Sequence, residues 1–277
     1  MSTAAGTPGP PPSRNDATSI LDATYIPAMA PSNLSARSTA GKQQRYAERD
    51  RQIRDAARRL LVERGLHGFS MEDVADAIAY SKGTVYQHYE SKEDALVASC
   101  AESGTRLAAL FERAAALPGT SRERMIAIVE AYCLFVERHP VPFRVIPLVH
   151  SPTVFEKASP ARILSVEAAH ERVRGACAAV VEWAVARGDL VPGPGIDART
   201  IPFALWAMML GSFLLTELHS SDKIFGVDDP AAAIRTQWAV YLDGLGWRPP
   251  RGEFDEDAAA RRIRSLLEAP TDAPPTS

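Results

Sequence analysis

Cysteine is scarce in this sequence of 277 residues, which contains only Cys100, Cys133 and Cys177. Three widely spaced cysteines match neither a disulfide framework nor the closely spaced ligands of a structural zinc site. The histidines show no metal-ligand spacing either. We therefore expect a reducing compartment, and neither a metal ion nor another cofactor.

Long hydrophobic runs are also missing. The longest one, residues 201–215, is interrupted by Pro202 and is shorter than the roughly 20 apolar residues that a membrane-spanning helix needs. The start of the sequence lacks the basic region and the apolar core of a signal peptide. These absences favour a cytoplasmic protein without a membrane partner.

Neither sign of charge dominates the whole chain, whose formal net charge is −3. The distribution is uneven, however, because residues 35–64 hold nine Lys or Arg against four acidic residues. The overall charge argues against a generic polyanion binder. A basic N-terminal module on a mildly acidic chain is instead typical of a DNA-binding head joined to a body with a different task.

The alternation of polar and apolar residues that marks β-strands is absent, whereas helical periodicity runs through most of the chain. We therefore predict an all-α fold with about nine core helices. Proline and glycine place the main breaks, for example at Pro118-Gly119 and at Gly188. The longer predicted helices span residues 45–63, 92–117, 121–138, 160–187, 197–219 and 230–245, with a short one at 142–149.

The most informative stretch is residues 69–96, FSMEDVADAIAYSKGTVYQHYESKEDAL. Ser70, Ser81 and Ser91 each precede a short helical pattern, as expected of N-cap residues. Asp73 and Asp94 follow the first and the third serine by three positions, which predicts capping boxes. Two short helices joined by a tight turn form a helix-turn-helix, whose second helix enters the major groove of DNA.

This stretch resembles the DNA-binding signature of the TetR/AcrR family of transcriptional regulators. The resemblance includes the serine-capped second helix, Ser-Lys-Gly-Thr, the aromatic-x-His-aromatic segment and the final Ser-Lys-Glu, and it covers about residues 45–96. Family members usually have Ala-Gly-Val in the turn, where this chain has Ile78-Ala79-Tyr80. Because glycine tolerates a positive φ, Ala79 predicts mild strain or a slightly different turn. Tyr80 is expected to be partly exposed.

The resemblance implies a three-helix head, a larger helical body that binds an effector, and a homodimer. The expected organisation is a disordered tail at residues 1–41, a helix-turn-helix domain at 42–92, an effector-binding and dimerisation domain at 93–248, and a mostly flexible tail at 249–277. The implied function is that of a ligand-responsive regulator of a double-stranded DNA operator, most often a repressor. A regulator without small-molecule control, or an activator, is the alternative.

The second helix of the motif carries most of the candidate DNA contacts. Lys82 and the free N–H groups of the first turn are suited to phosphate or a guanine edge, and Thr84 and Gln87 are the expected base readers. The resemblance implies further phosphate contacts at Ser70, Tyr86, His88 and Lys92. The N-terminal end of the basic run before the motif, near Arg45, is expected to contact the DNA backbone. The alternative is a solvated face of an ordinary helical bundle. The full candidate set is Arg45, Ser70, Ser81, Lys82, Gly83, Thr84, Tyr86, Gln87, His88 and Lys92.

The body offers less specific candidates. Large apolar side chains between helices can line a pocket, although each one alone is more often ordinary core. The apolar helix at 197–219 has more apolar surface than one core-facing stripe needs, which favours a two-fold dimer contact over the centre of a monomer. The expected pocket residues are Tyr132, Phe135, Phe143, Arg144, Trp183 and Trp206, with Phe111, Phe155, His150 and Glu167 as further guesses, and the expected dimer residues are Leu210, Phe213, Leu214 and Trp238.

Catalytic motifs are absent as well. The sequence has no nucleophile elbow, no phosphate-binding glycine loop, and no carboxylate or Cys/His pair in a recognisable setting. An enzyme carrying a helix-turn-helix is therefore not supported. The size of the body also argues against a DNA-binding protein that has no ligand.

Overall fold

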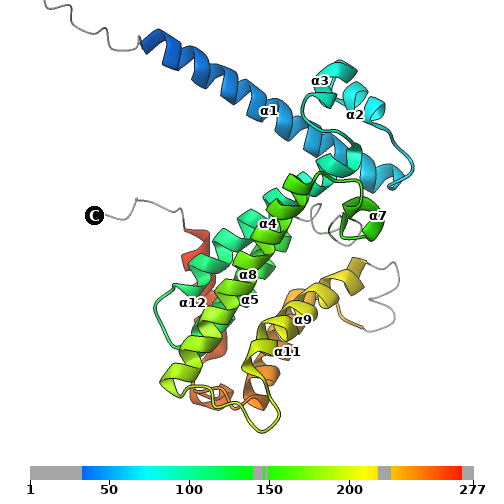
Figure 1. Ribbon diagram of the computed structural model, residues 1–277. Coiled ribbons are helices and arrows are strands. Elements are labelled where there is room, and N and C mark those ends of the chain that lie inside the picture. Colours follow the sequence, from blue (N-terminus) through cyan, green and yellow to red (C-terminus); the bar gives the residue numbers. More distant parts are fainter. Residues whose placement is uncertain (1–32, 140–145, 147–148, 218–225, 270–277) are drawn as a thin grey trace, which may run out of the picture. The chain divides into compact units, whose positions relative to one another are not determined.

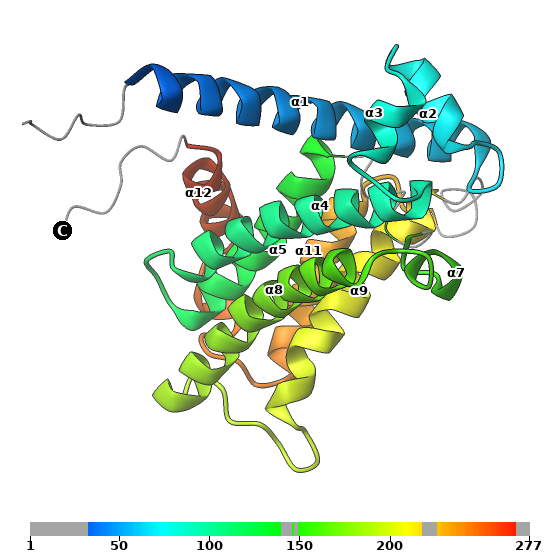
Figure 2. The same cartoon turned by 45° about the horizontal axis from the view of Figure 1, so that its top comes forward.

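The computed structural model describes residues 33–139, 146, 149–217 and 226–269. All regular structure in these residues is helical, which confirms the predicted all-α fold (Figures 1 and 2). The predicted short helix at 142–149 falls mostly outside the described residues. The α-helices are α1 (Asn33–Arg64), α2 (Met71–Ala77), α3 (Lys82–Tyr86), α4 (Lys92–Ala115), α5 (Ser121–Arg138), α7 (Pro152–Phe155), α8 (Pro160–Arg187), α9 (Ile201–Glu217), α11 (Pro230–Gly244) and α12 (Glu256–Glu268).

The first helix begins earlier than predicted. It starts at Asn33 instead of near Arg45, so the predicted disordered tail is wrong for residues 33–41, while its remaining part lies outside the described residues. The added residues 33–44 contain helix formers such as Ala36, Ala40, Gln43 and Gln44 next to weaker ones such as serine and glycine. The part before Tyr46 forms a unit of its own, whereas the buried stripe of α1 begins at Ile53.

Serine residues cap the three helices of the motif, as predicted. The hydroxyls of Ser70, Ser81 and Ser91 accept a hydrogen bond from the backbone N–H three positions later. At Ser70 the carboxylate of Asp73 also accepts from the Ser70 N–H at 2.8 Å, which completes the predicted capping box. The box predicted at Ser91 is only half formed, because the carboxylate of Asp94 accepts hydrogen bonds from Ser159 instead.

Ala79 has a φ of +55°, the one positive value among the described non-glycine residues. The turn therefore keeps the left-handed conformation that glycine adopts easily, and the alanine side chain carries its steric cost. Next to it, the hydroxyl of Tyr80 donates to Gln52 Oε1 at 2.7 Å, and the ring is half-buried against the core of the head. The hydrogen bond ties this turn to α1.

Two apolar cores are present, and α4 contributes to both. The first half of α4 packs with α1, α2 and α3, and its second half packs with α5, α8, α9 and α11. Helix α8 lies along α4 in both views (Figures 1 and 2). Cys100, Cys133 and Cys177 are all buried, and burial raises the pKa of each thiol to about 12. They therefore act as small apolar residues.

The segment after residue 249 is more ordered than predicted. Helix α12 packs on α5 and α4, with Ile263 and Leu267 in the body core. Its first turn meets the buried guanidinium of Arg122, whose Nη2 lies 2.6 Å from Glu256 Oε1. The expectation of a mostly flexible tail is therefore wrong for residues 256–268. The amphipathic pattern of this segment finds an apolar surface within the same chain.

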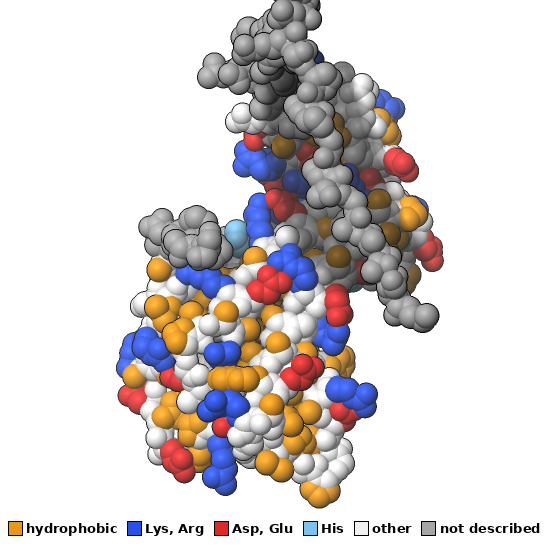
Figure 3. Space-filling view, turned by 60° about the vertical axis from the view of Figure 1, so that its left-hand side comes forward, with side chains coloured by type: hydrophobic (Ala, Val, Ile, Leu, Met, Phe, Trp, Pro, Cys, Tyr) orange, Lys and Arg blue, Asp and Glu red, His pale blue; other side chains and the backbone are white. Residues whose placement is uncertain are grey.

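Positive and negative side chains lie next to each other over much of the body. On the face shown in Figure 3, Lys and Arg are interspersed with Asp and Glu and with apolar side chains. Within the body, several such side chains form ion pairs, for example Arg172 with Glu112 at 2.7 Å. This face offers no uniformly basic surface to a nucleic acid, in contrast to the basic composition of residues 35–64.

Candidate DNA-binding surface and effector cavity

Helix α3 presents a polar face to solvent while Val85 anchors it in the core of the head. Lys82, Tyr86 and Gln87 are exposed, and Val85 is completely buried. Gly83 is exposed too, and a side chain there would meet only the Ser81 hydroxyl, at 3.9 Å. A helix that shows these side chains next to an unhindered backbone is suited to the major groove.

The start of α3 is held by a short polar cluster. Ser81 Oγ accepts from the Thr84 N–H at 3.2 Å and lies 2.8 Å from Thr84 Oγ1. Lys82 forms an ion pair with Glu72, whose carboxylate raises the pKa of Lys82. Its ammonium also lies 5.7 Å from the centre of the Tyr86 ring. Lys82 remains exposed, so DNA phosphate can compete with Glu72 for it.

His88 does not contact solvent in the way that the resemblance implies. Its side chain is 2% exposed and stacks on Tyr46 with ring centres 4.0 Å apart, and Nδ1 lies 3.4 Å from Asp50 Oδ1. Burial, followed by the charges of nearby arginines, lowers the pKa of His88. The expected phosphate contact is therefore corrected: this ring joins the end of α3 to α1.

Lys92 and Ser70 have partners within the chain. The Lys92 ammonium donates to the carbonyl oxygens of Leu66 and Phe69 at 2.6 Å each, and lies 4.8 Å from the centre of the Phe69 ring. The Ser70 hydroxyl is used by the capping box of α2. Lys92 thus closes the loop before α2 with two of its three donors, a role that the sequence motif did not reveal. Arg45 is exposed.

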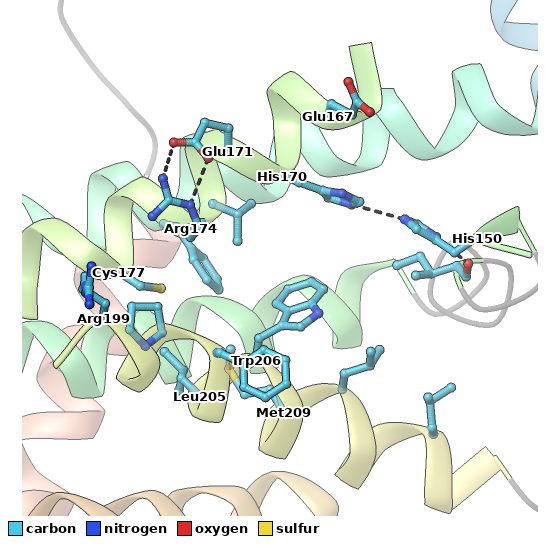
Figure 4. A pocket seen from close by; sticks show the side chains of 17 residues that line it. His150, Glu167, His170, Glu171, Arg174, Cys177, Arg199, Leu205, Trp206 and Met209 are labelled. Carbon is cyan, nitrogen blue, oxygen red and sulfur yellow. Dashed lines mark hydrogen bonds and ion pairs between the residues drawn. The ribbon is translucent and has the colours of Figure 1, made fainter. Parts of the chain in front are cut away.

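A cavity of about 590 Å³ lies in the body between α8 and α9, with Phe111 of α4 in its wall (Figure 4). Most of the wall is apolar. Cys177 and Val173 come from α8, while Leu205 and Trp206 come from α9. A cavity of this size with few polar groups is of the kind that small molecules occupy. Its remaining apolar wall is formed by Ile146, Pro202, Phe203, Met209, Leu210 and Leu214.

Polar side chains gather at two sides of this cavity (Figure 4). On one side, His150 and His170 have Nε2 atoms 3.3 Å apart, and His150 Nδ1 lies 2.7 Å from the Ile146 carbonyl oxygen. Because a carbonyl only accepts, His150 carries its proton on Nδ1 and accepts from His170 through Nε2. Burial and the neighbouring ring lower the pKa of His170. Arg174 lies on the other side, paired with Glu171.

The cavity contains only part of the predicted set. Trp206, Phe111, His150 and Glu167 line it, whereas Phe143 and Arg144 lie outside the described residues. The remaining four candidates, Tyr132, Phe135, Trp183 and Phe155, do not line the cavity, and Phe155 packs against the core of the head. Tyr132 and Phe135 belong to the body core, and Trp183 packs against Arg124, whose guanidinium carbon lies 3.9 Å from the ring centre. Sequence periodicity placed them on helices correctly but did not tell which helix face borders the cavity.

Two of the four predicted dimer residues are buried within the single chain and are not available to a partner. Phe213 and Trp238 are 9% and 2% exposed, and both belong to the core of the single chain. Leu210 and Leu214 face the cavity. Exposed residues on α9 and α11 include Ala207, Leu215, Gln237 and Val240. An almost completely apolar helix gives no signal in its sequence to separate its inner from its outer face, since all faces look alike.

Comparison with known proteins agrees with this geometry. The family model "Bacterial regulatory proteins, tetR family" matches residues 53–98, from the buried stripe of α1 to the first turns of α4. The HTH-type transcriptional activator FasR of Mycolicibacterium smegmatis is 32% identical over 99 residues, which is 36% of this chain. The aligned part covers 45% of that relative, so it spans less than half of its length.

Solved structures share the fold. PfmR, a TetR family transcriptional regulator from Thermus thermophilus, aligns with a TM-score of 0.55 and 22% identity over 70% of this chain and 98% of its own. The ketosteroid transcriptional regulator KstR2 of Mycobacterium tuberculosis aligns with a TM-score of 0.53 and 19% identity over 71% of this chain and 94% of its own. Identities this low show similarity of fold alone.

A helix-turn-helix head on an all-helical body defines a DNA-binding transcriptional regulator. Residues 53–98 match the TetR family of bacterial regulatory proteins, and the chain shares the fold of a TetR family regulator. The members of this family are regulators and not enzymes.

Proposed function

We propose that the chain is a homodimeric, cytoplasmic transcription factor that leaves a near-palindromic operator when a small lipophilic effector enters its body. The observation that carries this proposal is the position of α4. This helix starts at the end of the helix-turn-helix and contributes Phe111 to the cavity wall. An effector that changes the packing of Phe111 acts on the same helix that carries the head.

The DNA contact assigned to each head is the exposed face of α3. Thr84 and Gln87 read base edges, while Lys82 and Tyr86 contact phosphate and Gly83 allows a close approach. Arg45 and the basic residues near it are assigned to the DNA backbone. The exposure of α3 and its polar cluster at Ser81 support these roles. Several phosphate contacts in two heads predict that log K falls by roughly 0.9 per contact against log salt concentration.

The effector is proposed to be a mainly apolar molecule with at most one or two hydrogen-bonding groups. The wall is mostly apolar, and the two arginines that line it, Arg174 and Arg199, are paired with Glu171 and Asp197. An anionic ligand would therefore have to compete with a carboxylate for either arginine. The effector shifts the protein toward release by the ratio of its affinities for the two conformations.

The dimer is proposed to form through the outer faces of α9 and α11. The stretch Ala198–Leu215 is long and apolar enough to cross a membrane by composition, yet only 22% of it is buried within the chain. Val240 on α11 is 59% exposed as well. An apolar surface of this kind is typical of a protein–protein contact, and a two-fold dimer supplies the second head that a palindromic operator needs.

Genome-wide binding followed by footprinting tests the DNA part of this proposal. We expect protected sites with two half-sites about one helical turn apart, the spacing set by two heads. Protection of a single half-site would contradict the dimer. A reporter gene under the recovered site then decides the sign of regulation: expression should rise when the gene for this protein is deleted. A fall would identify an activator, the role that the name of the FasR relative states.

Thermal melting with a panel of apolar compounds tests the effector part. A compound present at about 100 times its Kd stabilises the folded state by about 2.7 kcal/mol and raises the melting temperature. The control is Leu210→Trp, which fills part of the cavity from α9. A true cavity ligand should lose its stabilising effect in this variant. If no compound raises the melting temperature of the parent protein more than that of Leu210→Trp, or if ligands leave DNA affinity unchanged, the regulator works without small-molecule control.

A further inference from the structure

Residues 157–162, at the junction of α7 and α8, contact the end of the helix-turn-helix through several polar groups. The backbone N–H and the hydroxyl of Ser159 donate to Asp94 Oδ1 at 3.0 and 2.8 Å. The hydroxyl of Ser91 donates to the Lys157 carbonyl oxygen at 3.2 Å, and Lys157 Nζ lies 3.6 Å from Glu93 Oε1. One short segment of the body thus meets the entire first turn of α4.

The same segment also contacts Tyr89, which lies three residues after the end of α3. The guanidinium carbon of Arg162 lies 5.0 Å from the centre of the Tyr89 ring, and Arg162 Nε lies 3.9 Å from Asp94 Oδ2. The Tyr89 hydroxyl accepts from Arg54 Nη1 of α1 at 3.0 Å. Arg162 therefore touches the head at a ring that is itself fixed to α1.

Burial makes these contacts energetically important. Asp94 is 3% exposed and Glu93 is 6% exposed. A buried carboxylate is costly unless it is hydrogen-bonded or paired. Within the part of the chain that the structure describes, the two carboxylates find their hydrogen-bond and ion-pair partners in residues 157–162. The head and the junction therefore cannot separate without exposing or unpairing two charges.

The carboxylate of Asp94 has a different hydrogen-bond donor from the acidic residues at the same position of α2 and α5. In the boxes of α2 and α5, the third residue, Asp73 or Glu123, accepts from the N–H of its own N-cap residue. Asp94 occupies the same position of α4, but its carboxylate accepts from Ser159. Ser159 in turn is the N-cap of α8, yet its hydroxyl forms no cap hydrogen bond there. The side chains of Asp94 and Ser159 are thus hydrogen-bonded to each other, between α4 and α8, and neither accepts a hydrogen bond that caps its own helix.

Helix α8 continues from this contact to the cavity. The cavity wall begins at Glu167 and includes His170 and Cys177 on α8. At 1.5 Å per residue, His170 lies about 12 Å along the helix axis from Arg162. A helix that shifts or rotates as a rigid body where it meets a ligand moves its first turn as well. The contact is thus placed at one end of a helix whose middle borders the cavity.

We propose that Ser159, Arg162 and Asp94 are positioning residues that set the orientation of α3 and transmit changes of α8 at the cavity to the DNA-reading head. They act through Tyr89 and the start of α4 and touch neither DNA nor effector. The transmission step rests on the proposed function, because it requires that occupancy of the cavity alters DNA binding. The orientation of α3 by Ser159 does not require an effector.

Removal of the Ser159 hydroxyl tests the positioning role. Because this hydroxyl does not cap α8 and the Ser159 N–H still donates to Asp94, Ser159→Ala should lower the melting temperature of the protein by only a few degrees. Affinity for the duplex recovered by selection from random DNA should change about three- to tenfold, the range for mutations in a coupling network. Amide exchange of residues 84–89 should become faster. Ser159→Thr keeps the hydroxyl and should restore both values.

Ser165→Ala is the matched control, since the Ser165 hydroxyl donates only to the Ala161 carbonyl oxygen on an exposed face of α8. The proposal is overturned if Ser159→Ala and Ser165→Ala have the same DNA affinity and the same exchange at α3. It is also overturned if Ser159→Ala lowers the melting temperature by more than a few degrees and Ser159→Thr does not restore DNA affinity, since the serine would then serve stability alone.

The transmission step is tested with Leu210→Trp as a substitute for an effector. In the parent protein this cavity-filling change should alter DNA affinity, and in the Ser159→Ala background its effect should fall to within about twofold. An equal effect in both backgrounds would overturn transmission through Ser159. If Leu210→Trp changes affinity in neither background and no cavity ligand does so, effector control fails, while the exchange and affinity data for Ser159 still decide its positioning role.

Discussion

At the scale of single residues, Ala79 shows how one position departs from its family without changing the turn. The backbone keeps a φ of +55°, which costs an L-residue about 1–2 kcal/mol relative to glycine. Ala79→Gly should remove this cost, although glycine also makes the unfolded chain more flexible. We expect a net gain of up to about 1 kcal/mol in the free energy of unfolding, measured by urea denaturation.

The control for this change lies two residues earlier. Ala77 is exposed at the end of α2, where glycine relieves no strain. Ala77→Gly should therefore destabilise the head by about 0.5–1 kcal/mol. If both substitutions were destabilising by the same amount, the left-handed conformation at position 79 would be wrong.

Gln87 is the residue whose proposed role is most directly testable. It is exposed on α3, and a glutamine side chain forms two hydrogen bonds with adenine in the major groove. Gln87→Ala should relax preference at one or two base pairs and cost about 1–3 kcal/mol on the best site, measured by binding to single-base variants of that site. His67→Ala, an exposed change outside α3, should leave preference unaltered. A uniform loss on all sequences would remove Gln87 from the base readers.

The buried His88 gives the head a dependence on pH. Its pKa is lowered in the folded protein by burial and by nearby arginines, so the folded state binds this proton more weakly than the unfolded state does. Stability from this group should be fully present above pH 6.5 and should decline as the pH falls below it. His88→Gln should flatten that decline in melting experiments between pH 7.5 and 5.5. An unchanged slope would assign the effect to His139 and His170, whose pKa values are also lowered.

At the scale of helices, α12 shows how a segment that looks peripheral becomes part of the body. Arg122 is fully buried, and its guanidinium is shared between Asp243 at the end of α11 and Glu256 at the start of α12. Removal of one partner from a buried ion pair leaves an uncompensated charge. The charge network therefore joins α5, α11 and α12.

Glu256→Gln should lower the free energy of unfolding by about 3 kcal/mol, the scale for breaking a buried pair. Calorimetry of the full-length protein provides the measurement. Asp257→Asn removes a neighbouring exposed carboxylate and is the matched control, with an expected effect below about 0.5 kcal/mol. Equal effects would show that the first turn of α12 is not held by Arg122.

At the scale of the whole molecule, the corrected outer faces of α9 and α11 change which substitutions should dissociate the proposed dimer. Val240→Glu and Ala207→Glu each place a charge on an exposed position. Across a two-fold contact these charges would be desolvated and would face their own copies. We expect monomers that remain helical, measured by sedimentation and circular dichroism.

Phe213→Glu is the contrasting variant, because this side chain lies in the core of the single chain. It should unfold the body instead of producing a folded monomer, since an unpaired charge would enter an apolar core. If Val240→Glu and Ala207→Glu remain dimeric, the interface lies elsewhere. Loss of DNA binding together with dimerisation would support the need for two heads.

Much of this protein could be predicted from the sequence, because local rules determine it. The serine caps, the turn at Ala79, the exposed face of α3 and the bounds of α5 and α8 follow from side chains that act within one or two helical turns. At Ala79 the sequence left mild strain or a different turn open, and the φ of +55° decides for the strained turn. These features need no information about which segments meet.

The tertiary structure decided what depends on contacts between distant segments. The sequence alone did not reveal that His88 packs on Tyr46, that Lys92 closes a loop, or that α12 packs on α5. It also did not separate the cavity-facing leucines of α9 from its core phenylalanine. The reason is physical: apolar periodicity shows that a face is buried, whereas the identity of its neighbour depends on how helices far apart in the chain pack together.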